Sequence, residues 1–178
     1  MSTAKLYYFA YGSNLHPLRL QQRVPSCQAL GIATLDQHQL RWHKRGGDGS
    51  GKCDAFFTGE EHDRLIGVVY SLVYEEKILL DQAEGLGNGY YLATATLQVA
   101  EQSVDTFFYQ AEEAHIDHSL RPYDWYHQLV LQGSRIHDLP DSYVEQHITT
   151  VNSLPDTDQV RNVLHQRIIS DYAAQTSN

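Results

Sequence analysis

Short apolar runs, separated by polar residues and glycine, occupy the first two thirds of the chain. Residues 6–10 form an aromatic run that stops near Gly12, as expected for a buried strand. Alternating residues over 91–99 predict a strand with one apolar face, and 104–111 can pair back with it across a polar turn. The remaining runs that predict strands are 29–34, 38–44, 54–59 and 63–74.

Helical patterns are inserted among these strands. Pro17 suits the first turn of a short helix that follows the first strand, because the N–H that proline lacks would be unpaired there anyway. Residues 74–85 begin with a pair of glutamates and end at Gly85, a common helix terminator. Glu84 therefore lies on the last turn of the second predicted helix.

Helices dominate the last third of the chain. Residues 121–133 place Tyr126, Leu129, Val130 and Gly133 on one helical face. Two more helices are predicted near 141–151 and 157–169, the latter with Val160, Val163, Leu164 and Arg167 or Ile168 on one side. We expect residues 171–178 to form a frayed tail.

The order of these elements predicts an α+β fold. Strict alternation of strand and helix is absent, which disfavours a doubly wound parallel sheet. We expect a mixed, barrel-like sheet with surrounding helices, closed by the C-terminal ones. The length of 178 residues suits a single domain over 1–178.

Charge and cysteine content narrow the choice of partner and compartment. The chain has 13 Lys plus Arg against 22 Asp plus Glu, a formal net charge of −9, so it lacks the basic surface that nucleic acid requires. Cys27 and Cys53 suggest neither a disulfide framework nor a zinc site. No apolar run is long enough for a membrane helix, and we expect a cytoplasmic protein without membrane contact.

Two local features could carry chemistry. The sequence YFAYGSNL at 8–15 joins a strand to a helix, and such loops gather unpaired N–H groups that can bind an anion. Many strand-to-helix turns use Gly and Ser only to bend the chain. Glu84 is the second feature: a carboxylate on a last helical turn is usually solvated, but the helix dipole disfavours an anion there, which suits a group that exchanges protons.

Together these features resemble the gamma-glutamylcyclotransferase family. The likeness rests on YFAYGSNL, on LLDQAEG at 79–85, on a Tyr-Tyr strand and on a Tyr-bearing helix, and it extends from Tyr8 to about Leu154. It implies a gamma-glutamylcyclotransferase-like, AIG2-like fold. The implied reaction converts a gamma-glutamyl amino acid or amine into 5-oxoproline and the free amine, by intramolecular attack of the substrate's α-amine and without a cofactor.

The resemblance also implies site residues. Glu84 is the implied general acid/base. Family members that act on glutathione or on gamma-glutamyl amines typically have Leu where this chain has Asn14, so Asn14 points to gamma-glutamyl amino acids. Asn14 and Tyr91 are further candidates for substrate binding. The principal substrate-binding candidates are Tyr8, Phe9, Ala10, Tyr11, Gly12, Ser13 and Tyr126.

Rival interpretations remain open at this stage. His115 and His118 have helical spacing but no evident third ligand, so we expect no metal site. The basic cluster 41–45 is more typical of a solvated strand end than of a ligand site, although it could attract an acidic substrate. The protein could be a non-catalytic binder of small acidic metabolites, or a hydrolase in which Glu84 activates water. A homodimer is possible, and loops 45–53 and 111–120 could line the site.

Overall fold

The computed structural model describes residues 4–176, and its main feature is a curled mixed sheet. Five strands follow the order β2-β5-β1-β7-β6, in which only the β1–β7 pair is parallel. The edge strands β2 and β6 contact each other, and a separate β3–β4 hairpin packs on β5 and β7. The strands are β1 (Lys5–Ala10), β2 (Gln28–Asp36), β3 (His38–Arg45), β4 (Gly51–Phe57), β5 (Arg64–Val73), β6 (Tyr90–Val99) and β7 (Gln102–Ala111). The predicted barrel-like mixed sheet is confirmed.

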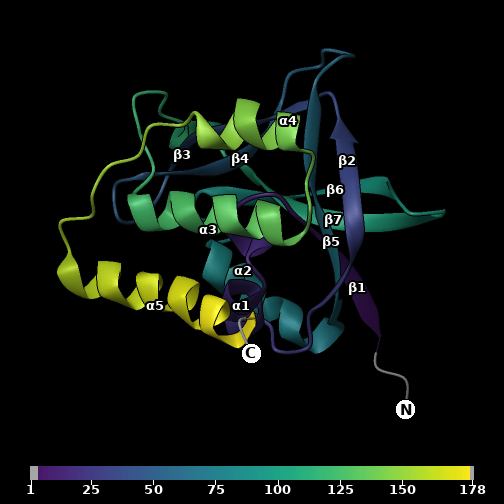
Figure 1. Cartoon of the computed structure of the whole chain (residues 1–178). Coiled ribbons are helices and arrows are strands. Elements are labelled where there is room, and N and C mark those ends of the chain that lie inside the picture. Colours follow the sequence, from purple (N-terminus) through teal and green to yellow (C-terminus); the bar gives the residue numbers. More distant parts are fainter. Residues whose placement is uncertain (1–3, 177–178) are drawn as a thin grey trace.

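Five α-helices surround this sheet within the described residues. Figure 1 shows α3 between α4 and α5, and α3 contacts both α5 and the turn that follows α4. None of the helices in residues 4–176 is long and apolar enough to span a membrane. The helices are α1 (Pro17–Arg23), α2 (Lys77–Glu84), α3 (Asp124–Ile136), α4 (Asp141–Val144), extended by a π-helical turn over Glu145–Thr149, and α5 (Gln159–Thr176).

Helix α5 differs from expectation in its exposed face and in its end. Val160 is 82% exposed, and Val163 and Leu164 are also exposed, whereas Ile168 is buried. The helix packs on α3 and α1 through another side. Residues 171–176 are helical rather than frayed, and the Tyr172 ring lies 5.2 Å from that of buried His16. Residues 177 and 178 of the predicted tail lie outside the described residues.

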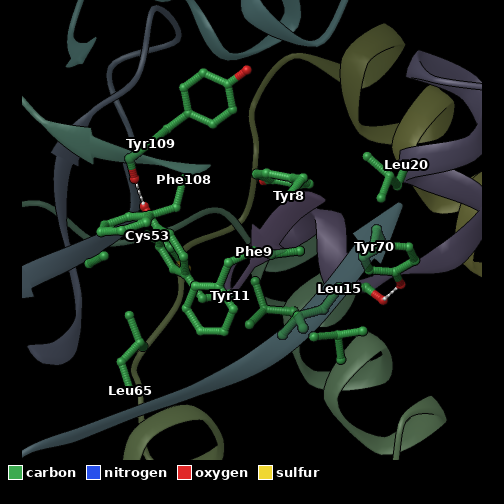
Figure 2. Packing of buried hydrophobic residues seen from close by; sticks show 14 of the residues in the cluster. Tyr8, Phe9, Tyr11, Leu15, Leu20, Cys53, Leu65, Tyr70, Phe108 and Tyr109 are labelled. Atoms are coloured by element: carbon green, nitrogen blue, oxygen red, sulfur yellow. Dashed lines mark hydrogen bonds between the residues drawn. The ribbon is translucent and has the colours of Figure 1, made fainter. Parts of the chain in front are cut away.

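The core holds the opening motif, YFAYGSNL at 8–15, in place from both sides. Phe9 is fully buried, and the Tyr70 hydroxyl donates to the Leu15 carbonyl at 3.2 Å (Figure 2). Helix α3 meets the 3-10 turn Ser13–Leu15 at Gly133, where a Cβ would come within 2.5 Å of the backbone of Leu15 and His16. A larger residue at 133 would push the helix away, so this glycine fixes the loop after β1 against α3.

Candidate active site

Glu84 is the last residue of α2, as the sequence predicts. Gly85 ends the helix in the left-handed conformation, with φ 70° and ψ 45°, and its N–H bonds back into the last turn. Leu80 is fully buried and anchors the helix to the core. Only 16% of the Glu84 side chain is exposed, so this carboxylate is not in bulk water.

The opening motif and α1 supply the partners of this carboxylate. Asn14 Nδ2 donates to Glu84 Oε1 at 2.8 Å, and Arg23 NH1 forms an ion pair with the same oxygen. These partners offset the cost of placing an anion at the carbonyl end of a helix. Glu84 Oε2 has no hydrogen-bond partner among residues 4–176, so one carboxylate oxygen is held while the other is available.

Asn14 is the centre of this small network. It is 3% exposed, its Nδ2 also donates to the Tyr8 hydroxyl at 3.0 Å, and its Oδ1 accepts from Arg23 NH1 at 2.8 Å. The amide therefore uses both its donor and its acceptor functions on β1, α1 and α2 at once. Asn14 connects the loop to Glu84.

We expect Asn14→Leu to destabilise the fold. Leu has a similar volume but leaves the Tyr8 hydroxyl without its hydrogen-bond partner and removes one of the two acceptors of Arg23, which costs about 1–3 kcal/mol. Urea unfolding of the variant checks this loss. Asn88→Leu, at an exposed loop position, is the matched control and is expected to change the free energy of unfolding by less than about 0.5 kcal/mol. Equal effects of the two substitutions would contradict the role of Asn14 as a connector.

The loop that carries Asn14 offers unpaired backbone donors. Ser13 and Asn14 begin a 3-10 turn, and within residues 4–176 neither of their N–H groups, nor that of Gly12, has a hydrogen-bond acceptor. Gly12 is closely packed, since a Cβ there would lie 3.0 Å from Cys53 Cβ and 3.3 Å from the Tyr126 hydroxyl. The loop can therefore approach a ligand with its backbone.

A cavity of about 250 Å³ adjoins Glu84. A second space of about 20 Å³ continues it inward, between the loop and several tyrosines. The larger cavity is lined by four cations, although the chain as a whole is acidic, which suits it to a small anionic ligand. These cations are Arg19, Arg23, Lys44 and Lys52.

Comparisons with known proteins agree on the family. The AIG2-like family profile matches residues 64–146, which include Glu84. Human gamma-glutamylcyclotransferase is 27% identical over 150 residues, which cover 78% of this chain and 75% of the relative. The bovine protein of that name is 26% identical over 143 residues, or 76% and 73% of the two chains. The predicted resemblance to the AIG2-like, gamma-glutamylcyclotransferase family is confirmed.

A solved structure called gamma-glutamyl cyclotransferase has the same fold as this chain. It superposes with a TM-score of 0.79 at 21% sequence identity, and the match covers 92% of this chain and 99% of the other. The predicted fold class is thus confirmed by an independent structure.

Five of the seven principal substrate-binding candidates lie at the cavity or its inward extension. Phe9 and Ala10 are the exceptions: both are fully buried and neither lines the cavity or its inward extension. Alternation along β1 turns the Phe9 side chain to the face opposite Tyr8, whereas Ala10 shares the face of Tyr8 but is fully buried in the core. The candidates that line it are Tyr8, Tyr11, Gly12, Ser13 and Tyr126.

Tyr91 is not at this cavity. Its side chain is 43% exposed and lines a separate hollow with Asp54 and His118. Its neighbour Tyr90 is 5% exposed and lines the cavity instead, because successive side chains of a strand point to opposite faces. The structure therefore brings Tyr90, and not Tyr91, to this cavity.

Tyr126 holds the wall opposite the loop through its hydroxyl. The Cys53 N–H donates to this oxygen at 3.1 Å, and the ring is 6% exposed. Burial raises the pKa of the Tyr126 hydroxyl well above its usual value, and burial likewise raises the pKa of the Cys53 thiol. Both groups stay protonated near neutral pH, so Cys53 is not a thiolate nucleophile.

Sequence reasoning missed three of the four cations of the site and gave Lys44 only a possible role in attracting an acidic substrate. Arg19 and Arg23 are one turn apart on α1, but such spacing also occurs on ordinary solvated helices. Lys44 was assigned to a solvated strand end, yet it is 6% exposed. Lys52, at the start of β4, pairs with Asp48 at 2.8 Å. Within residues 4–176 no cluster of three or more His, Cys, Asp or Glu side chains is arranged to hold a metal ion.

Proposed function

We propose that this protein converts a gamma-glutamyl amino acid or a gamma-glutamyl amine into 5-oxoproline and the free amine. The observation that carries the proposal is the geometry of Glu84, with one oxygen held by Asn14 and Arg23 and the other available beside a loop of unpaired N–H groups. The names of the human and bovine relatives support the same reaction.

The proposed reaction is an intramolecular acyl transfer. Glu84 Oε2 takes a proton from the substrate's α-ammonium, and the free amine then attacks the γ-carbonyl carbon. The tetrahedral intermediate collapses when the bond to the departing nitrogen breaks, and Glu84 returns its proton to that nitrogen. The ring nitrogen then loses its second proton, which the departing amine takes to become an ammonium ion, so atoms and charge balance without water.

The protein's main contribution is to hold the substrate in a folded shape. Both reacting groups belong to one molecule, and oriented intramolecular reactions reach effective molarities of roughly 10⁵ to 10⁸ M. The N–H groups of Gly12, Ser13 and Asn14 are suited to the developing oxyanion or to the substrate's α-carboxylate. No step of this chemistry calls for a cofactor.

Cytoplasmic location is a further part of the proposal, together with a place in gamma-glutamyl and glutathione metabolism. Cys27 and Cys53 are both free thiols, which is typical of a reducing compartment. Fractionation of cells that produce the protein at its natural level tests the location.

Product analysis tests the proposed reaction against its rivals. We expect the purified protein, incubated with gamma-glutamyl amino acids, glutathione and gamma-glutamyl-lysine, to release 5-oxoproline from at least one of them. Free glutamate as the first product would instead identify a hydrolase. Ligand-induced thermal stabilisation without any product would identify a non-catalytic binder of acidic metabolites.

Tyr126→Phe is expected to lower kcat/KM by about tenfold. The substitution leaves the buried Cys53 N–H without its acceptor and so disturbs the cavity wall, a cost of about 1–3 kcal/mol. Tyr91→Phe is the matched control, because Tyr91 lines a different hollow and should keep wild-type kinetics. Steady-state kinetics of both variants test the assignment of Tyr126 to the active site. A larger loss of kcat/KM in Tyr91→Phe would assign Tyr91 to the site instead.

A further inference from the structure

Lys44 is an unusual lysine at the cavity. It lies near the end of β3, is 6% exposed, and lines the same cavity as Glu84. Its ammonium nitrogen lies 4.3 Å from the centre of the Tyr90 ring. The face of an aromatic ring attracts a cation, but it does not supply the hydrogen-bond acceptors that an ammonium group needs.

The Lys44 ammonium has no protein partner that would explain its burial. Within residues 4–176 it forms no ion pair and no hydrogen bond, whereas Arg23 pairs with Glu84 and Lys52 with Asp48. Arg19 also lacks a carboxylate, but it donates to the Ser13 hydroxyl at 3.1 Å. A buried charge without a partner is costly, so Lys44 is the cation that most needs an anionic ligand.

The surroundings of Lys44 leave a defined place for its ammonium. A Cβ on Gly89 would come within 2.8 Å of both Nζ and Cε, so glycine at 89 makes room for the side chain. Burial lowers the pKa of Lys44, against the opposing effect of nearby carboxylates, of which Glu84 is the strongest. A bound carboxylate would offset this burial cost.

The position of Lys44 indicates which end of the substrate it meets. The α-ammonium must reach Glu84 Oε2, and the glutamyl carboxylate is only one carbon away from it. Ser13, Arg19 and Arg23, all within residues 13–23, surround that region together with the loop N–H groups. Lys44 comes from a different wall, beside Gly46 and Gly47. A substrate whose glutamyl end lies at the loop would direct its departing group toward this second wall.

We propose that Lys44 binds the carboxylate of the departing amino acid and so selects gamma-glutamyl amino acids over gamma-glutamyl amines that lack this group. The inference rests on the proposed function, because it assigns a role within the same reaction. It makes Lys44 a specificity-determining residue, and it predicts a preference that Glu84 and the loop alone would not produce.

Two substrates that differ only in the carboxylate test this assignment. Gamma-glutamyl-alanine and gamma-glutamyl-ethylamide have the same amide and the same carbon branch up to the missing group. We expect the wild-type kcat/KM for 5-oxoproline formation to favour the alanine compound roughly 10- to 100-fold, the range of a charge-assisted hydrogen bond. A wild-type ratio near one would overturn the assignment without any variant.

Lys44→Met should remove this preference selectively. Its kcat/KM for gamma-glutamyl-alanine should fall roughly 10- to 100-fold, mainly through KM, while turnover of the ethylamide stays near wild type and reports that the site is intact. Lys44→Arg should recover part of the preference. Arg45→Met is the control, because it removes the same charge from the adjacent residue, whose side chain is 55% exposed and pairs with Asp117. It should leave kcat/KM unchanged for both substrates.

The possible failures are distinguishable. Equal losses for both substrates in Lys44→Met would overturn the role of Lys44 and leave the proposed function intact, as would a preference that survives the substitution. Absence of 5-oxoproline from these two compounds and from the rest of the substrate panel would overturn the proposed function, and the assignment of Lys44 with it. Release of 5-oxoproline from other members of the panel but from neither of these compounds would overturn the assignment alone.

Discussion

Glu84→Gln is expected to lower kcat by about 10²- to 10⁴-fold, the range that a positioned acid/base group contributes. Glutamine keeps the shape of the side chain and can still accept from Asn14 through its amide oxygen, but it cannot take a proton from an ammonium. The loss should therefore fall on kcat. The melting temperature should change little, because the carboxylate is partly exposed and lies at a helix end. Steady-state assays of 5-oxoproline formation check the prediction.

Glu75→Gln provides the matched control for this substitution. Glu75 lies in the 3-10 turn that precedes α2, is exposed, and is the same residue type in the same segment of chain. Wild-type kinetics are expected for this variant. Retention of wild-type turnover by Glu84→Gln would show that the carboxylate of Glu84 is not the acid/base.

Gly12→Val should have the second largest effect, a loss of about 10²- to 10³-fold in kcat, comparable to the loss of an oxyanion donor. A Cβ at this position already lies 3.0 Å from Cys53 Cβ, and valine adds two methyl groups against the Tyr126 hydroxyl. The loop must shift to accommodate them, which displaces its N–H groups from the reacting carbonyl. Overpacking also costs about 1–3 kcal/mol of stability, so thermal melting accompanies the kinetics.

Ser13→Ala separates backbone from side-chain roles in the same loop. Its hydroxyl accepts from Arg19 Nε at 3.1 Å, and alanine removes that acceptor but leaves the backbone N–H in place. We expect a loss of only a few fold, since the backbone donors remain. A larger loss in Ser13→Ala than in Gly12→Val would favour Ser13 as a nucleophile and contradict the intramolecular mechanism.

The sequence was sufficient for the elements that carry Glu84 and the loop. The run of apolar residues before Gly12 and the pair Glu84–Gly85 are local signals, because a strand end and a helix end each depend on a few neighbouring residues. The closeness of residues 14 and 84 depends on the tertiary fold. It came from the family resemblance, and the 2.8 Å contact of Asn14 with Glu84 agrees with it.

The burial of Lys44 in the cavity wall could not be predicted from hydrophobic patterning. A register shift between Arg41 and Lys44 in the β3–β4 pairing places the consecutive residues His43 and Lys44 both in buried positions. Strict alternation would have exposed one of them. The choice between Tyr90 and Tyr91 could not be predicted either, because two adjacent tyrosines do not indicate which of them faces the site.

The exposed face of α5 has a different cause. Val160, Val163 and Leu164 share a side at helical spacing, yet the helix packs through a neighbouring side, where His165 stacks on Trp125 and Tyr172 lies near His16. Apolar periodicity finds a helix but does not decide which of two part-apolar faces is covered. The partners of α5, α1 and α3, are far away in the sequence.

One isotope measurement tests the central claim most directly. The purified protein is incubated with gamma-glutamyl-alanine in water enriched with heavy oxygen, and the products are analysed by mass spectrometry. Intramolecular attack predicts 5-oxoproline and alanine in equal amounts, with no heavy oxygen in either product. Glutamate that carries a heavy oxygen would show that water, rather than the substrate's own amine, attacks the γ-carbonyl, and it would contradict the account.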